Sequence, residues 1–276
     1  MQNRSFARNT WDGVLKKING LFHNPYRQVN LNWLKLKYYK HLPNGKLRRH
    51  RLKGKYIYFY STTEFLHGLR EIFIDKIYNQ KLPQNPFIID CGANIGLSII
   101  YMKELYPKAN ILAFEPDQKN FELLEKNIDS YGYSDISLHK EAVWIQDTEI
   151  SFVSDASMSS KIEEGDSTTS DKVKAIRLKD YLNKKVDFLK IDIEGAEFKV
   201  LCDIEEKLNM VDNLFIEYHG LYEQQDELTN IISILSKNGF KFYIKEAAGI
   251  YLHPFTKQKD PAIPYDIQLN IFCFRN

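Results

Sequence analysis

The sequence predicts an α/β protein with a doubly wound, mainly parallel sheet. Runs of strand-forming residues alternate with helical patterns over residues 87–244, as expected when helices join parallel strands. A glycine-containing turn follows the first of these strands, where open parallel sheets bind ligands. The 276 residues, 43% of them hydrophobic, are enough for one large domain and an appendage.

The beginning of the chain predicts a separate, basic α+β extension over residues 1–60, followed by the main domain at residues 61–276. Apolar spacing, turn residues and prolines define its elements and the helix that follows it. In chain order they are an amphipathic helix at 11–22 ending before Pro25, short strands within 29–60 with a turn at Asn44-Gly45, and a helix at 66–77.

The main domain predicts strands and helices in alternation, with an antiparallel pair at the end. Residues 154–174 are polar and without apolar periodicity, so we interpret them as a loop over the substrate or a surface insertion. The elements are strands at 87–91, 111–114, 136–139, 186–191 and 214–218, a closing pair at 240–244 and 269–274, and helices at 95–106, from the N-cap Asp117 to 128, after 194, and at 228–235 ending at Gly239.

The turn after residues 87–91 indicates which cofactor the sheet binds. Its spacing is Gly92-x-x-x-Gly96, whereas dinucleotide folds place a glycine wherever the backbone approaches the pyrophosphate. S-adenosylmethionine has no phosphate, so these glycines need only let the backbone pass its methionine part. Asp90 can engage its ammonium group directly or through water. Glu115 ends the next strand, where a carboxylate can accept both ribose hydroxyls. The sequence therefore predicts S-adenosylmethionine rather than NAD.

Acidic residues also follow two later strands. Asp192 and Glu194 come after one of them, and Glu217 and His219 end the next. An alcohol that accepts a methyl group must lose its proton, so Asp192, Glu194 or His219 is a candidate catalytic base. Asp192 with Glu217 could instead hold a divalent cation such as Mg²⁺. The alternative for each acid is capping of the next helix or pairing with a cation such as Lys190.

Charge is unevenly distributed along the chain. Residues 1–55 contain 14 Lys and Arg against Asp12 alone, a net charge of +13, and the remainder has a net charge of −11. We expect the basic segment to dock on the acidic body, although it could also meet an anionic substrate. The alternatives are peripheral contact with an anionic membrane through the helix at 11–22, or pairing of that helix with a second copy to form a homo-oligomer.

The sequence predicts a cytoplasmic protein, with peripheral contact at the inner face of the membrane as a further option. No apolar run approaches the length of a membrane span, and the N-terminus lacks the apolar core and cleavage site of a secretory signal. Cys91, Cys202 and Cys273 are unclustered and apolar in context, so we expect reduced core residues.

At these motifs the sequence resembles the FkbM-type family of S-adenosylmethionine-dependent methyltransferases. The resemblance runs from about Glu64 to Tyr218. It is carried by Arg70-Glu71-Ile72-Phe73, Ile89-Asp90-Cys91-Gly92-Ala93-Asn94-Ile95-Gly96, Phe114-Glu115-Pro116-Asp117, Leu189-Lys190-Ile191-Asp192-Ile193-Glu194-Gly195-Ala196-Glu197 and Ile216-Glu217.

The resemblance implies a class I methyltransferase fold, Rossmann-like with a seven-stranded sheet, and methylation of hydroxyl groups on natural products or glycans. It also implies roles by position. Asp90, Gly92, Asn94, Gly96 and Glu115 with Pro116 would bind the cofactor, Glu141 and Ala142 would flank its adenine, and Asp192 with Glu194 would border the acceptor.

The leading hypothesis is an O-methyltransferase acting on a sugar hydroxyl of a polysaccharide, a glycolipid or another glycosylated product, with a small molecule or a glycan as acceptor. An N-methyltransferase is the nearest alternative, and a non-catalytic cofactor-binding scaffold in a glycan-assembly complex is the other. Nucleic acid is not an expected partner, because the fourth strand ends in Asp192-Ile193-Glu194-Gly195 rather than the Asn/Asp-Pro-Pro-Tyr/Phe signature of base methyltransferases.

Overall fold

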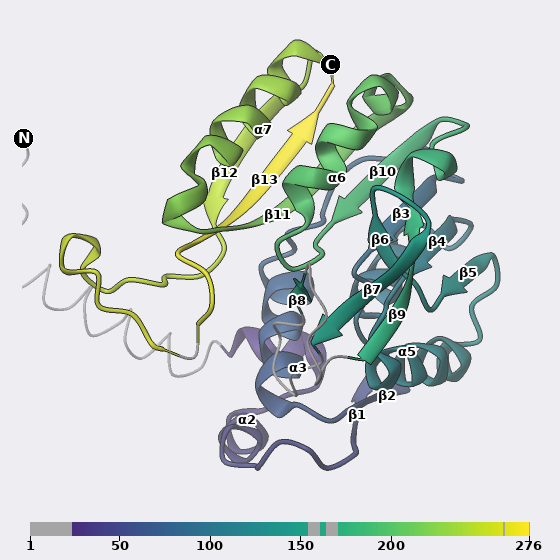
Figure 1. Ribbon diagram of the computed structural model, residues 1–276. Coiled ribbons are helices and arrows are strands. Elements are labelled where there is room, and N and C mark those ends of the chain that lie inside the picture. The colour runs from purple at the N-terminus through teal and green to yellow at the C-terminus, as the bar shows by residue number, and fades with distance from the viewer. Residues whose placement is uncertain (1–23, 154–160, 164–170, 262, 276) are drawn as a thin grey trace, which may run out of the picture. The chain divides into compact units, whose positions relative to one another are not determined.

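The computed structural model describes residues 24–153, 161–163, 171–261 and 263–275 (Figure 1). The chain divides into two compact units, residues 1–77 and 78–276. The helix expected at residues 11–22 lies outside the described part of the chain. Within that part, no helix is long and apolar enough to cross a membrane.

A seven-stranded sheet forms the centre of the second unit. Its order is β12 (Lys241–Glu246), β13 (Ile267–Phe274), β11 (Val211–Gly220), β10 (Val186–Ile191), β3 (Phe87–Cys91), β4 (Asn110–Phe114) and β5 (Ile136–His139). The strands from β11 to β5 are parallel, and β13 is antiparallel to both β11 and β12. The seven strands and the closing antiparallel pair that we expected are therefore confirmed.

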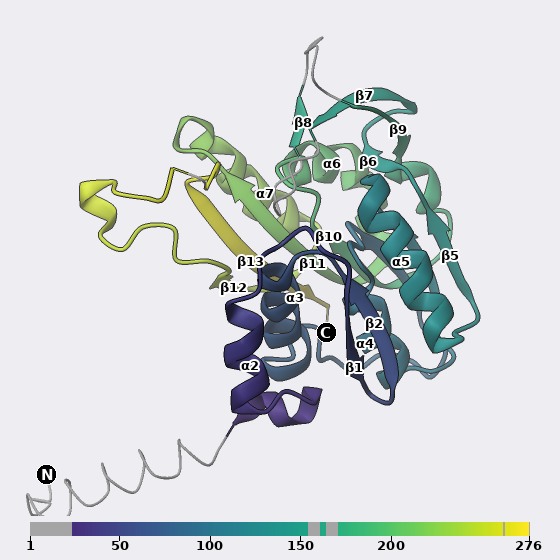
Figure 2. The ribbon, with the colours of Figure 1, turned by 90° about the horizontal axis from the view of Figure 1, so that it is seen from below.

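Helices cover both faces of this sheet. α4 (Leu97–Leu105) and α5 (Gln118–Tyr131) follow β3 and β4, whereas α6 (Glu197–Ile204) and α7 (Gln225–Lys237) follow β10 and β11. Because the strand order reverses between β3 and β10, right-handed crossovers place the two helix pairs on opposite faces (Figures 1 and 2). Open α/β sheets bind ligands at the carboxyl ends of the strands beside such a reversal.

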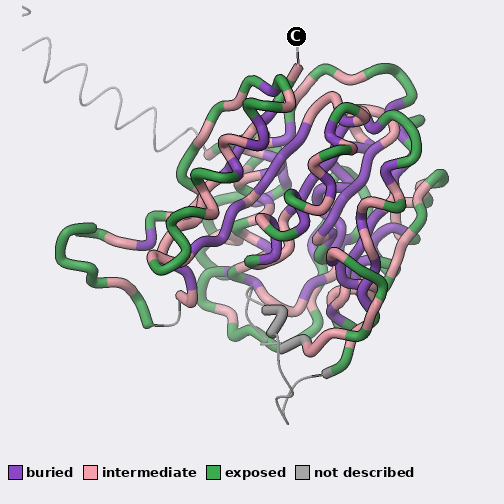
Figure 3. Tube along the Cα trace, turned by 45° about the horizontal axis from the view of Figure 1, so that its top comes forward, coloured by how far each residue is buried: buried purple, intermediate pink, exposed green. Residues whose placement is uncertain are grey.

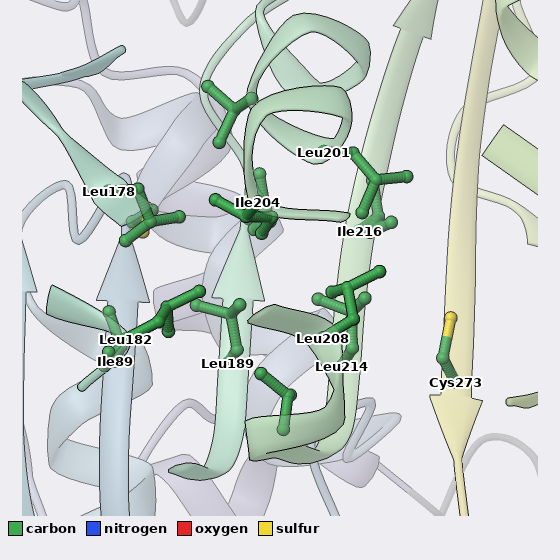
Figure 4. Packing of buried hydrophobic residues seen from close by; sticks show 14 of the residues in the cluster. Ile89, Leu178, Leu182, Leu189, Leu201, Ile204, Leu208, Leu214, Ile216 and Cys273 are labelled. Atoms are coloured by element: carbon green, nitrogen blue, oxygen red, sulfur yellow. The ribbon is translucent and has the colours of Figure 1, made fainter. Parts of the chain in front are cut away.

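The main core lies between the sheet and the helices α6 and α7. Burial is concentrated along the central strands (Figure 3), where Leu189 and Ile216 pack against Leu201 and Ile204 of α6 (Figure 4). Parallel strands that are covered on both faces need such continuous apolar runs. Because such apolar runs are visible in the sequence, these strands could be predicted from it.

The three cysteines do not all lie in the core. Cys91 and Cys273 are buried, as expected, and burial raises the pKa of both thiols. Cys202 is exposed, so the expectation of a core residue is wrong there. It lies on α6 between the core residues Leu201 and Ile204, and neighbouring helical positions face different directions.

A second, four-stranded sheet follows β5. Its order is β6 (Ala142–Trp144), β9 (Asp171–Arg177), β7 (Thr148–Val153) and β8 (Lys161–Glu163). The expected irregular segment at 154–174 is therefore wrong at 161–163 and 171–174, and its other residues lie outside those the structure describes. From Lys172 to Ala175 exposed and less exposed residues alternate, which is typical of a half-buried strand.

The first unit contains a helix where the sequence predicts only strands. Its elements are η1 (Pro25–Val29), α2 (Trp33–Lys40), β1 (Arg48–Leu52), β2 (Lys55–Phe59), α3 (Thr62–Gly68) and η2 (Leu69–Ile74). Asn32 caps α2 by accepting a hydrogen bond from the Lys35 amide at 2.8 Å. The Leu-Lys-Leu-Lys alternation in α2 resembles a strand, but the capped helix places Tyr39 against the hairpin of β1 and β2.

The hairpin and the unit boundary also differ from expectation. Lys53 and Gly54, both with positive φ, close the hairpin in place of Asn44-Gly45. The boundary lies after Ile77 and not after residue 60. Phe65 of α3 stacks on Phe59 of β2 with 3.9 Å between ring centroids, which joins this helix to the first unit.

Truncating a core side chain should lower stability far more than the same truncation at the surface. We expect Leu189→Ala, at a side chain that is 0% exposed, to lower the free energy of unfolding by about 2–5 kcal/mol. Leu252→Ala, at a side chain that is 84% exposed, should change it by less than about 0.5 kcal/mol. Urea titration followed by circular dichroism measures both, and equal effects would contradict this core.

Candidate active site

The turn after β3 passes close to two other segments, which gives each of its glycines a packing role. Gly92 has a φ of +84°, and a Cβ there would lie 1.8 Å from the Asp192 carbonyl oxygen. Gly96 has a φ of +88°, and a Cβ there would lie 2.8 Å from the Leu124 side chain of α5. Both positions therefore need glycine for conformation and for close approach. The sequence predicts only that the two glycines make room for the cofactor, and it gives no sign of these contacts within the protein.

Glu115 links the turns that follow β3 and β4. Its two carboxylate oxygens accept backbone hydrogen bonds from Asn94 at 2.8 Å and from Asp117 at 3.0 Å. Burial raises the pKa of Glu115 to about 7, although these two hydrogen bonds oppose the shift. Each oxygen keeps a second lone pair, so the carboxylate can still accept hydrogen bonds from two ribose hydroxyls.

Asp90 is buried beside a lysine that the sequence analysis named only as a pairing partner. One carboxylate oxygen of Asp90 accepts a hydrogen bond from the Ser98 hydroxyl at 2.5 Å. The other lies 3.2 Å from the Lys190 ammonium and has no hydrogen-bond partner among the described residues. A buried acceptor with spare capacity fits the ammonium group of S-adenosylmethionine.

Lys190 joins the cofactor turn to the acidic end of β10. Its ammonium donates to the Gly92 carbonyl at 2.8 Å and lies 3.1 Å from Asp192. Although burial opposes it, Asp192 and Asp90 hold the pKa of Lys190 well above its usual value. The lysine is therefore charged, and it compensates two carboxylates at once.

The residues expected near the adenine lie at the start of the small sheet. Glu141 precedes β6, its carboxylate pairs with Lys174, and it lies 3.3 Å from His139 Nδ1. These partners lower the pKa of Glu141, despite the opposing effect of burial. Ala142 is buried as the first residue of β6, and Pro116 is half-buried after Glu115. Their contact with cofactor stays a prediction.

Asp192, Glu194 and His219 converge at the carboxyl ends of β10 and β11. One polar atom from each lies within 4.8 Å of the others. His219 Nε2 lies 3.6 Å from a Glu194 carboxylate oxygen and 3.8 Å from one of Glu217. Burial raises the pKa of Glu194 to about 8. Against the effect of burial, the surrounding carboxylates raise the pKa of His219 to about 10.

Glu194 reaches this cluster by leaving the strand. Alternation along β10 predicts that Asp192 and Glu194 share a side with Lys190, which requires strand geometry beyond Ile191. The strand ends at Ile191, and Glu194 has a φ of +57°, in the left-handed region that only a few residue types adopt easily. The Tyr265 hydroxyl donates to the Glu194 carbonyl at 2.8 Å and holds this conformation.

Glu197 orients His219, and the sequence analysis did not identify it as a site residue. It is buried in the first turn of α6, where its carboxylate accepts the amides of Ile193 and Gly195 at 3.1 and 3.0 Å. The same carboxylate lies 3.2 Å from His219 Nδ1. This contact directs Nε2 toward Glu194 and Glu217. An acid in the first turn of a helix normally suggests only a cap.

Two further residues come from the end of the chain, Tyr265 from the long excursion between β12 and β13 and Gln268 from β13 itself. The Tyr265 ring packs against the His219 ring with 4.7 Å between centroids. Gln268 Nε2 donates to Glu217 at 2.7 Å and lies 3.1 Å from His219 Nε2. No local signal marks either residue, because the sheet brings them beside β11 across some 50 residues of chain.

The expected metal pair, Asp192 with Glu217, is not the group that converges most closely. The converging group is Asp192, Glu194 and His219, whereas Glu217 is hydrogen-bonded to Gln268. The Lys190 ammonium already lies 3.1 Å from Asp192. A cation would have to compete with this lysine, so the arrangement fits a divalent ion poorly.

A seven-stranded sheet of this order, with carboxylates ending β3 and β4, is the arrangement expected of a class I methyltransferase. Residues 90–242, more than half of the chain, match the family model described as the Methyltransferase FkbM domain. The chain belongs to this family of S-adenosylmethionine-dependent methyltransferases. The family, the fold and the cofactor that the sequence predicts are thus confirmed.

The chain is also similar in sequence to several curated methyltransferases. Methyltransferase 1 of Beauveria bassiana (strain ARSEF 2860) is 31% identical over 205 residues, which cover 64% of this chain and 80% of that protein. 31-O-demethyl-FK506 methyltransferase FkbM of Streptomyces tacrolimicus is 24% identical, over 77% of this chain and 93% of that protein. Hexuronic acid methyltransferase AglP of Haloferax volcanii is 27% identical, over 61% and 69%.

Cofactor binding should weaken as the pH falls through the range in which Glu115 takes up a proton. The ionised carboxylate accepts the ribose hydroxyls, and its pKa of about 7 means that it loses charge below neutral pH. We expect the affinity for adenosylhomocysteine to fall between pH 8 and pH 6. The association constant should decrease in proportion to the fraction of Glu115 that remains ionised. Isothermal titration calorimetry measures this dependence.

Glu115→Gln tests the assignment. It should weaken binding by roughly 10- to 100-fold, since a hydrogen bond to a charged group is worth about 1.5–3 kcal/mol, and should flatten the pH dependence. Glu122→Gln, on the exposed side of α5, should keep both the affinity and the slope. A Glu115→Gln variant with an unchanged slope would show that another group titrates.

Proposed function

We propose that this enzyme methylates a hydroxyl oxygen, and that the hydroxyl belongs to a sugar of a polysaccharide, a glycolipid or another glycosylated product. The observation that carries the proposal is the convergence of Glu194 and His219 beside Asp192. A neutral hydroxyl oxygen is a weak nucleophile and must lose its proton as it attacks, whereas a neutral amine is nucleophilic without a base. The similarity to proteins named for an oxygen of FK506 and for hexuronic acid supports this acceptor class.

Glu194 is the residue we propose to take the proton. Its side chain is 26% exposed and can meet an acceptor, whereas that of His219 is 2% exposed. A pKa near the working pH favours proton transfer in both directions, and the pKa of Glu194 is raised to about 8. His219, fixed by Glu197, places its Nε2 3.6 Å from the Glu194 carboxylate.

The bonds and charges balance in a single displacement. S-adenosylmethionine supplies a methyl group on a positively charged sulfur and leaves as adenosylhomocysteine. The acceptor oxygen gains the methyl group and gives its proton to Glu194, which then releases it to water. Lys190 keeps the Gly92 turn and Asp192 at a fixed spacing, so the chain contributes chiefly by positioning the two reactants.

Labelled S-adenosylmethionine and a panel of glycan acceptors test the reaction. We expect the label in an ether-linked methyl group on sugar oxygen. Glu194→Gln should lower kcat by about 10²- to 10⁴-fold, the usual contribution of a general base, with the affinity for adenosylhomocysteine unchanged. Glu246→Gln, an exposed glutamate at the end of β12, should remain fully active.

Other outcomes would select the alternatives. Label found only on nitrogen or on protein would replace the O-methyltransferase with an N-methyltransferase. A Glu194→Gln variant that retains turnover would remove Glu194 as the base. A variant that has lost turnover but keeps its biological role would favour the cofactor-binding scaffold.

A divalent cation that acidifies the hydroxyl is the alternative to a direct base. Because Lys190 neutralises Asp192 and Gln268 binds Glu217, we expect turnover without a metal. Treatment with EDTA followed by dialysis should change kcat by less than about twofold. A large loss that Mg²⁺ restores, but Na⁺ at equal ionic strength does not, would show a metal-dependent reaction.

A further inference from the structure

We propose that the outer side of α2 docks on an anionic lipid surface. We define this α2 face by Trp33, Leu34, Lys37, Tyr38 and Lys40, all of which are exposed. The proposal concerns a surface of the first unit and does not depend on which atom the enzyme methylates.

The α2 face is held in a fixed orientation from the inside. Tyr39 is buried, and its ring lies 5.8 Å from that of His50 and 6.1 Å from that of Phe59, so α2 is anchored on the β1–β2 hairpin. At 100° per residue, the positions on either side of Tyr39 turn away from this contact. Trp33 and Leu34 lie about 120° and about 140° around the helix from Tyr39, and they are 63% and 69% exposed.

The chain segment that carries α2 and the β1–β2 hairpin has charges of a single sign. Residues 24–60 contain ten Lys and Arg and no Asp or Glu. On the hairpin, Arg49 and Arg51 are exposed on alternate positions of β1. Such a segment attracts an anionic surface, and the attraction falls as salt is added.

The apolar residues favour lipid over a soluble polyanion. Leu34 has no group that could stack on a base or form a hydrogen bond to a sugar, and it gains free energy only by leaving water. Trp and Tyr prefer the membrane–water interface, where an apolar ring and a polar atom are both accommodated. The Lys37 ammonium lies 5.3 Å from the centroid of the Trp33 ring. The α2 face therefore presents a positive charge to the lipid headgroups beside an aromatic ring that can enter the acyl-chain region.

Co-sedimentation of the full chain with vesicles tests the proposal. We expect binding to phosphatidylcholine vesicles that contain phosphatidylglycerol, and at least about tenfold weaker binding to phosphatidylcholine alone. Trp33→Ser with Leu34→Ser, and separately Lys37→Gln with Lys40→Gln, should each weaken binding to the anionic vesicles by about tenfold. The control is Tyr243→Ser on β12, because the Tyr243 side chain is 64% exposed, about as much as that of Trp33. This variant should bind anionic vesicles as strongly as the wild-type protein.

Tryptophan fluorescence reports whether the α2 face enters the lipid. In a Trp11→Phe background, the remaining tryptophans are Trp33 and the buried Trp144. Anionic vesicles should shift the emission to shorter wavelength, and Trp33→Phe should abolish the shift. Each variant should keep its affinity for adenosylhomocysteine, which shows that it is folded.

Three results would overturn the proposal. Wild-type binding by the Trp33→Ser, Leu34→Ser protein would show that the α2 face does not take part. Loss of binding on deletion of residues 1–23 alone, with the α2 variants unaffected, would move the contact to that segment. Tight binding to an RNA oligonucleotide with none to anionic vesicles would show that the basic surface serves nucleic acid.

Discussion

The site depends on one buried charge, the ammonium of Lys190. It lies between Asp90, at the end of β3, and Asp192, at the end of β10, and it also donates to the carbonyl of Gly92. Two carboxylates at adjacent strand ends would otherwise repel each other in a medium of low dielectric constant. The lysine therefore allows two carboxylates to lie close together. Asp90 serves the cofactor side, and Asp192 lies on the acceptor side.

A second cation organises the acceptor side in the same way. His219 is surrounded by Glu194, Glu197 and Glu217, and their charges outweigh the effect of burial on its pKa. Glu197 is fixed by the backbone amides of Ile193 and Gly195, so it acts as the support. Glu194 is strained, partly exposed and raised in pKa, a combination typical of a functional residue.

Much of the fold could be predicted because its signals are local. The strands at β3, β10 and β11 are continuous apolar runs that end in acids. Asp117 marks a helix start by its capping side chain, and Gly239 marks a helix end by its positive φ. The errors occur where tertiary contacts override local pattern. The segment of α2 was expected to be strand, and its Leu-Lys alternation resembles one. Packing of Tyr39 on the hairpin outweighs this local pattern and favours the helix. Cys202 was expected in the core, but the register of α6 directs it outward.

The sequence by itself determined the family, the class of cofactor and the set of carboxylates at the strand ends, because these follow from residue type and order along the chain. Only the tertiary structure decided which groups meet. Lys190 bridges two strands, and Glu197 turns back to His219. Gln268 of β13 and Tyr265 just before it reach the site from far along the chain. Such contacts are set by sheet order and register, which bring together residues that no spacing in the sequence connects.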